Sequence, residues 1–81
     1  MNKYPITALD ALNFGENGIF VSYAENDELQ RRLKALGLTS GTEITALKNH
    51  TGGITAYRFR GTYIALNARQ KKELFVIKKS E

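Results

Sequence analysis

The sequence of 81 residues contains no cysteine and a single proline, Pro5. The absence of cysteine excludes disulfides, zinc–thiolate sites and iron–sulfur ligation, and it fits a reducing compartment. No later element loses a backbone N–H donor to proline. No run approaches the ~20 consecutive apolar residues of a membrane-spanning helix. Residues 1–5 lack the apolar core of a signal peptide, so we expect the protein to stay in the cytoplasm.

The composition is that of one ordinary folded domain. Apolar residues make up 42% and charged residues 25% of the chain, which is too hydrophobic for a disordered tail. A chain this short builds one core, so we assign residues 1–81 to a single domain. The net charge of +4 is uneven, because residues 1–30 carry one lysine and five acids, whereas residues 31–81 carry eleven lysines or arginines and three acids. This asymmetry indicates either a basic face for an anionic partner or a solubilising surface.

Residues 27–36 have the pattern of a short amphipathic helix. Leu29, Leu33 and Leu36 recur at i, i+4 and i+7, and Gly37 supplies a residue that adopts positive φ after a helix. We expect Leu33 and Leu36 to be buried in the core and Leu29, one turn earlier, to be partly exposed.

Five further segments have the alternation and the β-branched or aromatic content of short strands. They are residues 19–23, 42–49, 54–60, 63–66 and 74–78. Turns are predicted at residues 13–18, which hold two glycines and an Asn-Gly pair, and at the hairpin of residues 49–53. Residues 6–12 predict a lead-in turn, and residues 67–72 one helical turn. Strands this short are most stable when they curl into a small barrel that hides their edges. The sequence therefore predicts a mainly β protein, a small SH3-like β-barrel of five short strands with one α-helix inserted after the first strand.

Residues 32–44 read RLxxLGLxxGTxI, and the flanking sequence has further motifs in a fixed order. The flanking motifs are Leu9-x-x-Leu12, a glycine-bearing turn before Ile19, Gly61-x-x-Ile64-Ala65-Leu66, and the closing Leu74 and Val76. Over residues 9–77 the sequence resembles the ferrous iron transport protein A (FeoA) family. Two features depart from the family pattern. Lys71 stands where the family has a small apolar residue, and the hairpin turn at residues 50–53 lacks a proline.

The resemblance implies an SH3-like domain that acts as a cytoplasmic accessory protein of ferrous-iron uptake. The implied partner is the large membrane ferrous-iron transporter, through its cytoplasmic GTP-binding domain. The same type of domain also ends some metal-dependent repressors, so a regulator-type domain is an alternative, since a fold alone does not fix a role.

We predict that a partly apolar groove or an exposed strand edge, flanked by arginines, binds the partner. The predicted partner-binding residues are Leu29, Arg31, Arg32, Leu33, Arg58 and Arg60. Arginines at the rim of such an interface steer an acidic partner and set its orientation more than they supply affinity.

No catalytic, cofactor or metal site is predicted. Nucleophilic or acid–base chemistry needs a nucleophile, a base and an orienting partner, and no such arrangement is visible. His50 is the single histidine and sits in a predicted hairpin turn, whereas a transition-metal site needs three or four ligands. Gly37 and Gly41 follow a helix and precede a strand, which is the reverse of the order in a phosphate-binding loop. The sequence therefore predicts a protein that is not an enzyme.

Nucleic-acid binding is the other function that we consider. Residues 57–60 read Tyr-Arg-Phe-Arg, and small barrels use interleaved aromatic and basic residues to stack bases and follow a phosphate backbone. The pleat of a strand places Tyr57 and Phe59 on one face and Arg58 and Arg60 on the other. If the rings fill the core, the arginines remain outside without them. We therefore favour a protein partner and expect no nucleic acid.

Overall fold

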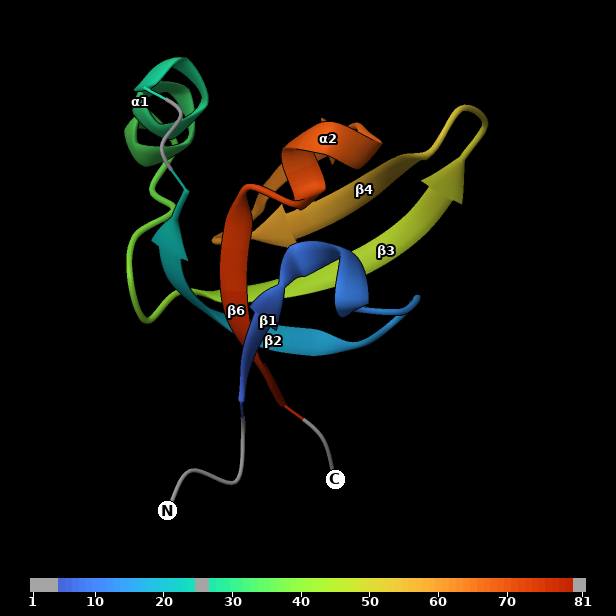
Figure 1. Cartoon of the computed structure of the whole chain (residues 1–81), viewed down its shortest axis with the longest axis horizontal. Coiled ribbons are helices and arrows are strands. Elements are labelled where there is room, and N and C mark those ends of the chain that lie inside the picture. Colours follow the sequence, from blue (N-terminus) through green and yellow to red (C-terminus); the bar gives the residue numbers. More distant parts are fainter. Residues whose placement is uncertain (1–4, 25–26, 80–81) are drawn as a thin grey trace.

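The computed structural model describes residues 5–24 and 27–79, and within them six antiparallel strands form one curled sheet (Figure 1). The strands are β1 (Ile6–Ala8), β2 (Asn17–Tyr23), β3 (Glu43–His50), β4 (Ile54–Phe59), β5 (Thr62–Leu66) and β6 (Leu74–Lys79). Their order across the sheet is β1-β6-β2-β3-β4-β5. The helices are a 3₁₀ turn, η1 (Leu9–Ala11), and two α-helices, α1 (Asp27–Ala35) and α2 (Ala68–Lys71).

The first strand is one that the sequence did not predict. Residues 6–8 pair with β6, with Ile6 opposite Ile77, and the predicted lead-in turn is confined to η1. A strand of three residues is too short for alternation to be recognised, and its first residue, Ile6, is 55% exposed. The prediction of five strands was therefore one short, and α1 follows the second strand rather than the first.

The turn predicted at residues 13–18 is confirmed in its first part, around Gly15, whereas Asn17 and Gly18 begin β2. Gly18 lies opposite Ile44 of β3, and it is buried. A Cβ built on Gly18 would lie 3.3 Å from the Leu12 Cδ1 atom and 3.3 Å from the Val76 Cβ atom. The glycine is thus explained by close packing of neighbouring elements over the strand rather than by a turn. The turn itself lies just before it, at Gly15, where φ is +83°.

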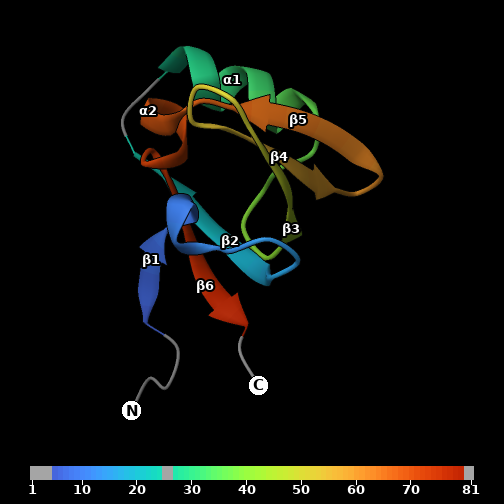
Figure 2. The same ribbon diagram turned by 90° about the vertical axis from the view of Figure 1, so that its right-hand side faces the viewer.

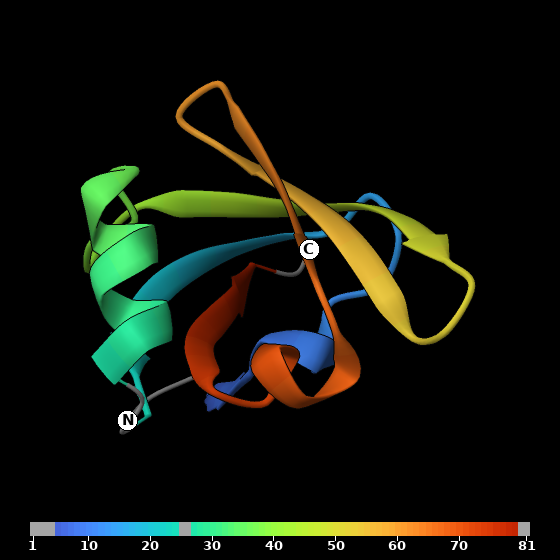
Figure 3. The ribbon, with the colours of Figure 1, turned by 90° about the horizontal axis from the view of Figure 1, so that it is seen from above.

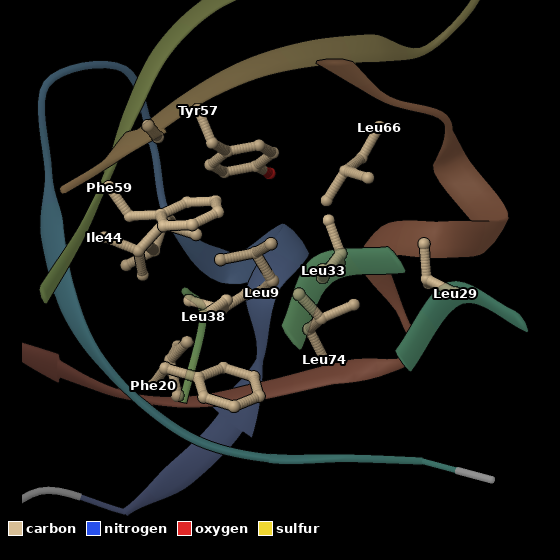
Figure 4. Packing of buried hydrophobic residues seen from close by; sticks show 13 residues of the cluster. Leu9, Phe20, Leu29, Leu33, Leu38, Ile44, Tyr57, Phe59, Leu66 and Leu74 are labelled. Carbon is tan, nitrogen blue, oxygen red and sulfur yellow. The ribbon is translucent and has the colours of Figure 1, made fainter. Parts of the chain in front are cut away.

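The curled sheet is open, since its outer strands β1 and β5 each have one neighbour. Helix α1 lies at one end of the curled sheet (Figures 2 and 3). Leu29 and Leu33 of α1 are both buried, and Leu33 lies between Leu66 of β5 and Leu74 of β6 (Figure 4). The helix thereby closes one end of the core.

The core contains thirteen buried apolar residues from all parts of the fold. They are Leu9, Leu12, Phe20, Leu29, Leu33, Leu38, Ile44, Ala46, Tyr57, Phe59, Leu66, Leu74 and Val76. In β3, β4 and β6 the buried residues fall at alternate positions, which is typical of strands with one face in a core. Tyr57 and Phe59 are each 1% exposed, so both rings of β4 fill the interior.

The end of α1 corrects the predicted burial of its leucines. Leu29 is 5% exposed and Leu36 is 43% exposed, the reverse of the expectation. The helix ends at Ala35, and Gly37, with φ at +104°, reverses the chain, so Leu36 lies outside the last helical turn. The Leu38 N–H donates to the Leu33 carbonyl at 3.0 Å, a bond typical of this type of helix end. Leu38 then takes the core position that Leu36 was expected to fill.

The predicted helical turn near the C-terminus is confirmed as α2. The Asn67 side chain accepts a hydrogen bond from the Gln70 N–H at 2.8 Å, and the Gln70 side chain accepts one from the Asn67 N–H at 2.9 Å. This reciprocal capping satisfies two backbone donors that a short helix leaves unpaired. In the described part of the chain, no helix is long and apolar enough to span a membrane.

Candidate functional site

A row of side chains crosses the outer face of the sheet. Asn17 of β2 lies opposite Thr45 of β3, Thr45 opposite Arg58 of β4, and Arg58 opposite Tyr63 of β5. The Thr45 hydroxyl donates a 2.6 Å hydrogen bond to the Asn17 side-chain oxygen. Arg58 is exposed and Tyr63 is 66% exposed. The register therefore places an exposed guanidinium next to an exposed aromatic ring near the outer edge of the sheet.

Arg60 connects the sheet to the end of α1. It occupies the turn between β4 and β5 with a φ of +49°, and its Nε donates a 3.0 Å hydrogen bond to the carbonyl of Gly37. A carbonyl at a helix C-terminus lies at the negative end of the helix dipole, where a cation is stabilising. Arg60 therefore has a structural contact as well as an exposed position.

These two arginines line a shallow groove of about 400 Å³, which we call the arginine groove. Its residues are Asn17, Gly41, Thr42, Glu43, Thr45, Arg58, Phe59 and Arg60. Glu43 brings a carboxylate into the groove, but its Oε2 lies 3.5 Å from the Lys79 ammonium and is partly neutralised there. The sequence predicted Arg58 and Arg60 for this surface. It did not identify Asn17, Thr45 or Tyr63, because their proximity depends on a strand register that the sequence does not reveal.

The other predicted partner-binding residues lie on two different faces of α1, one buried and one exposed. The side chains of Leu29 and Leu33 are buried in the core, whereas Arg31 and Arg32 are exposed. Leu29 and Leu33 therefore have a packing role, and a partner that contacts α1 meets the arginine side of the helix. Arg31 and Arg32 are not among the residues that line the arginine groove. Their role in partner binding stays a prediction.

A chain of hydrogen bonds occupies the opposite end of β4. The Lys71 ammonium donates to the Thr55 hydroxyl at 2.9 Å, and the Thr55 hydroxyl donates to the Asn49 side-chain oxygen at 2.8 Å. Thr55 is 5% exposed, so Lys71 provides a polar partner for a buried group at the position where the family pattern has a small apolar residue. His50, predicted in the hairpin turn, is instead the last residue of β3, and it is exposed.

Two tyrosines that pack in or against the core, Tyr57 and Tyr23, have raised pKa values. Burial raises the pKa of Tyr57 to about 12, and burial likewise raises the pKa of Tyr23 to about 12. The Tyr23 hydroxyl donates a 2.6 Å hydrogen bond to the Leu38 carbonyl. Both phenols are therefore neutral at physiological pH and have structural roles. Among residues 5–24 and 27–79, no three His, Asp or Glu side chains gather closely enough to hold a metal ion.

The sequence and the fold were compared with known proteins. The family model for the FeoA domain matches residues 7–78. An iron uptake regulatory protein (FeoA) has a TM-score of 0.79 at 24% identity, and the alignment covers 93% of this chain and 100% of that one. The FeoA protein from Chlorobium tepidum has a TM-score of 0.84 at 21% identity, with 91% of this chain and 71% of that chain covered.

A manganese-dependent transcriptional repressor also has this fold, with a TM-score of 0.82 at 14% identity. The alignment covers 98% of this chain but 45% of the repressor, so the likeness concerns one part of that protein and shows the fold alone. A search of curated proteins finds no match.

The family model spans almost every described residue, and the structural relatives share the predicted SH3-like architecture. The chain therefore belongs to the FeoA domain family, which is associated with ferrous-iron uptake.

Proposed function

We propose that this chain is an accessory protein of ferrous-iron uptake that docks onto the cytoplasmic GTP-binding domain of the membrane ferrous-iron transporter and catalyses no reaction itself. The observation that carries the proposal is the arginine groove on a domain of this family. Arg58 and Arg60 line the groove, and neither forms an ion pair with any acid among the described residues. Two such cations on one surface favour an acidic partner.

The filled interior supports recognition through the surface. The largest side chains of the core, including Tyr57, Phe20 and Phe59, are almost fully buried and occupy the space inside the curled sheet (Figure 4). A small barrel packed in this way leaves little space inside the sheet for a substrate, so we infer that its outer face makes the macromolecular contacts. The net charge of +4 adds long-range attraction toward an acidic surface.

The burial of Tyr57 and Phe59 also favours a protein partner over a nucleic acid. Single-stranded nucleic acid is held by stacking bases on exposed rings, and these two rings face the core. Arg58 and Arg60 therefore lack the two aromatic neighbours that the sequence suggested, Tyr57 and Phe59, and the exposed ring opposite Arg58 is that of Tyr63 instead. Protein docking, by contrast, uses the arginines without the rings.

The test is binding to the purified GTP-binding domain of the transporter, measured by biolayer interferometry. We expect Arg58→Glu to weaken binding about tenfold or more, because the substitution replaces an attractive charge by a repulsive one. Arg69→Glu is the matched control, since Arg69 lies on α2 with a side chain that is 86% exposed. The affinity of the Arg69→Glu variant should stay within about twofold of wild type, because an exposed charge that lies outside the interface contributes little to binding.

Equal loss in both variants would indicate a general charge effect, and no loss in Arg58→Glu would contradict the role of the arginine groove. A second arm measures retention of single-stranded RNA and DNA. Retention that falls steeply with salt would support the nucleic-acid alternative, because counterions released from phosphates make such binding strongly salt-dependent.

A further inference from the structure

The geometry of the turn before β5 determines which backbone N–H and C=O groups lie on the outer edge of the strand. Phe59 and Thr62 are opposite each other, and Arg60 and Gly61 between them have φ angles of 49° and 75°. Two consecutive positive φ values are typical of the type I′ turn of a two-residue hairpin. The pair that closes such a hairpin exchanges both N–H···O bonds, and hydrogen-bonded pairs then alternate along the antiparallel ladder. Every second residue of β5, starting from Thr62, therefore directs its backbone groups toward β4.

The residues between them, Tyr63 and Ala65, direct their N–H and C=O groups away from β4. No strand lies on that side, because β5 ends the sheet order. Among residues 5–24 and 27–79, no backbone hydrogen bond from another segment reaches Tyr63 or Ala65. Two donors and two acceptors are thus available along one strand edge, and Tyr63 and Ala65 are both exposed.

The two edges of the sheet differ in how well they are protected. β1 has three residues and follows Pro5, and short strands and prolines are features that discourage pairing with other chains. β5 has five residues, Thr-Tyr-Ile-Ala-Leu, with no charge, no proline and no register shift against β4. An edge without these protective features is suited to receive another strand.

The charges beside this edge indicate what kind of strand fits. Arg58 lies directly opposite Tyr63 on the outer face, and Arg60 begins the turn that leads into β5. The ion pairs of the described residues use other cations, namely Arg69, Lys78 and Lys79. A second copy of this chain fits poorly, because pairing two β5 edges would bring both sets of arginines together on a protein of net charge +4. A strand with acidic side chains complements them.

We propose that β5 is a strand-addition site, at which an extended acidic segment of the partner pairs with Tyr63 and Ala65 and continues the sheet. Backbone hydrogen bonds then hold the segment, and Arg58 and Arg60 select its acidic side chains. This inference rests on the proposed docking function and names its mode of binding.

The probe is the blocked peptide TEVEVEVT, in which glutamates alternate with valines on the two faces of a strand. Binding is followed by NMR titration at millimolar peptide, with hydrogen exchange of the Tyr63 and Ala65 amides. We expect saturable binding, and protection of these two amides in the complex.

Two changes remove the backbone hydrogen bonds between β5 and the peptide, one made in the protein and one in the peptide. Ala65→Pro removes an outward N–H that β4 does not use, so the fold is retained, whereas Ala65→Ser is the matched control that keeps the N–H. N-methylation of alternate backbone amides of the peptide removes hydrogen bonds that the peptide donates to β5, and it requires no protein variant. We expect each to weaken binding about tenfold, while Ala65→Ser stays close to wild type. The lysine peptide TKVKVKVT should bind more weakly than the glutamate peptide.

The inference is overturned if the glutamate peptide does not bind, if the methylated peptide binds equally well, or if the two amides stay unprotected. It is also overturned if sedimentation shows a dimer that Ala65→Pro abolishes, because the edge would then serve a second copy. Binding measurements with the GTP-binding domain of the transporter distinguish failure of strand addition from failure of the proposed docking function. Binding that tolerates Ala65→Pro contradicts strand addition alone, whereas peptide binding without any binding of the transporter domain contradicts the docking function alone.

Discussion

Arg60 and Gly37, 23 residues apart in the chain, form one structural unit in which the arginine Nε donates a 3.0 Å hydrogen bond to the glycine carbonyl. Both residues have positive φ, +49° for Arg60 and +104° for Gly37, so two reversals of the chain meet at this bond. The contact ties the β4–β5 turn to the end of α1. Among residues 5–24 and 27–79, the Arg58 side chain has no comparable hydrogen bond or ion pair, which makes it the better residue for testing partner binding without disturbing the fold.

The first prediction concerns Gly37→Ala. A Cβ on Gly37 would lie 3.2 Å from the Arg60 Cδ atom, and an alanine at a φ of +104° is strained. We expect the free energy of unfolding to fall by about 2 kcal/mol, from backbone strain together with displacement of the arginine. Urea denaturation followed by circular dichroism measures it.

Gly15→Ala is the matched control for this substitution. Gly15 has a φ of +83°, but nothing lies within 4 Å of its added Cβ, so the substitution carries backbone strain alone. It should cost about 1 kcal/mol. The excess cost at Gly37 should shrink when Arg60 is already alanine. An equal cost at both glycines would show that the contact with Arg60 contributes nothing.

The second prediction concerns alkaline pH. Tyr57 titrates with a pKa of about 12 in the folded state, raised by burial from 10.0. A pKa raised by folding means that its stabilising effect is complete below pH 10 and is lost as the pH rises toward 12. Relative to Tyr57→Phe, wild type should therefore lose up to about 2–3 kcal/mol of unfolding free energy over this range. Urea denaturation at several pH values tests it, and the lysines that titrate there are common to both proteins. A constant difference would contradict the prediction.

The third prediction concerns acid. The Asn13 backbone N–H donates a 2.7 Å hydrogen bond to Glu16, and the Lys78 ammonium lies 3.1 Å from the same oxygen. These contacts, the backbone bond first, lower the pKa of Glu16 below 4.5. Stability from a lowered carboxyl pKa is present above pH 4.5 and is lost as the pH falls through the folded value. Wild type should have a higher melting temperature than Glu16→Gln at neutral pH, and the two should converge in acid. Lys78→Met should diminish the difference, and its persistence at low pH would count against the ion pair.

The inward faces of the longer strands could be predicted because alternation is a local property. Ile44 and Ala46 on β3, like Leu74 and Val76 on β6, are buried as the pattern indicates. The outer row could not be predicted in the same way. Whether Tyr63 lies beside Arg58 is decided by the β4–β5 register, and a shift of one residue would move each side chain to the opposite face.

Two other features could not be predicted from the sequence, each for a different physical reason. The strand at residues 6–8 has too few residues for a period of two to be recognised, and it is stabilised by pairing with a segment some seventy positions away. The Lys71 ammonium has a buried partner, Thr55, that lies 16 residues earlier. Contacts of this kind join distant segments and leave no local pattern, so Lys71 was visible in the sequence as a departure from the family and not as a hydrogen-bond donor.

The leucines of α1 provide the last prediction. The sequence predicted that Leu36 is buried and Leu29 partly exposed, but the helix ends at Ala35, and Leu29 and Leu36 are 5% and 43% exposed. Leu29→Ala should lower the free energy of unfolding by about 2–4 kcal/mol, because it removes buried methyl groups and leaves a cavity between the helix and the sheet. Leu36→Ala is the matched control and should cost less than about 1 kcal/mol, since surface substitutions rarely cost more. Urea denaturation of both variants decides the order, and a larger loss at Leu36 would mean that the helix continues past Ala35 and that Leu36, not Leu38, completes the core.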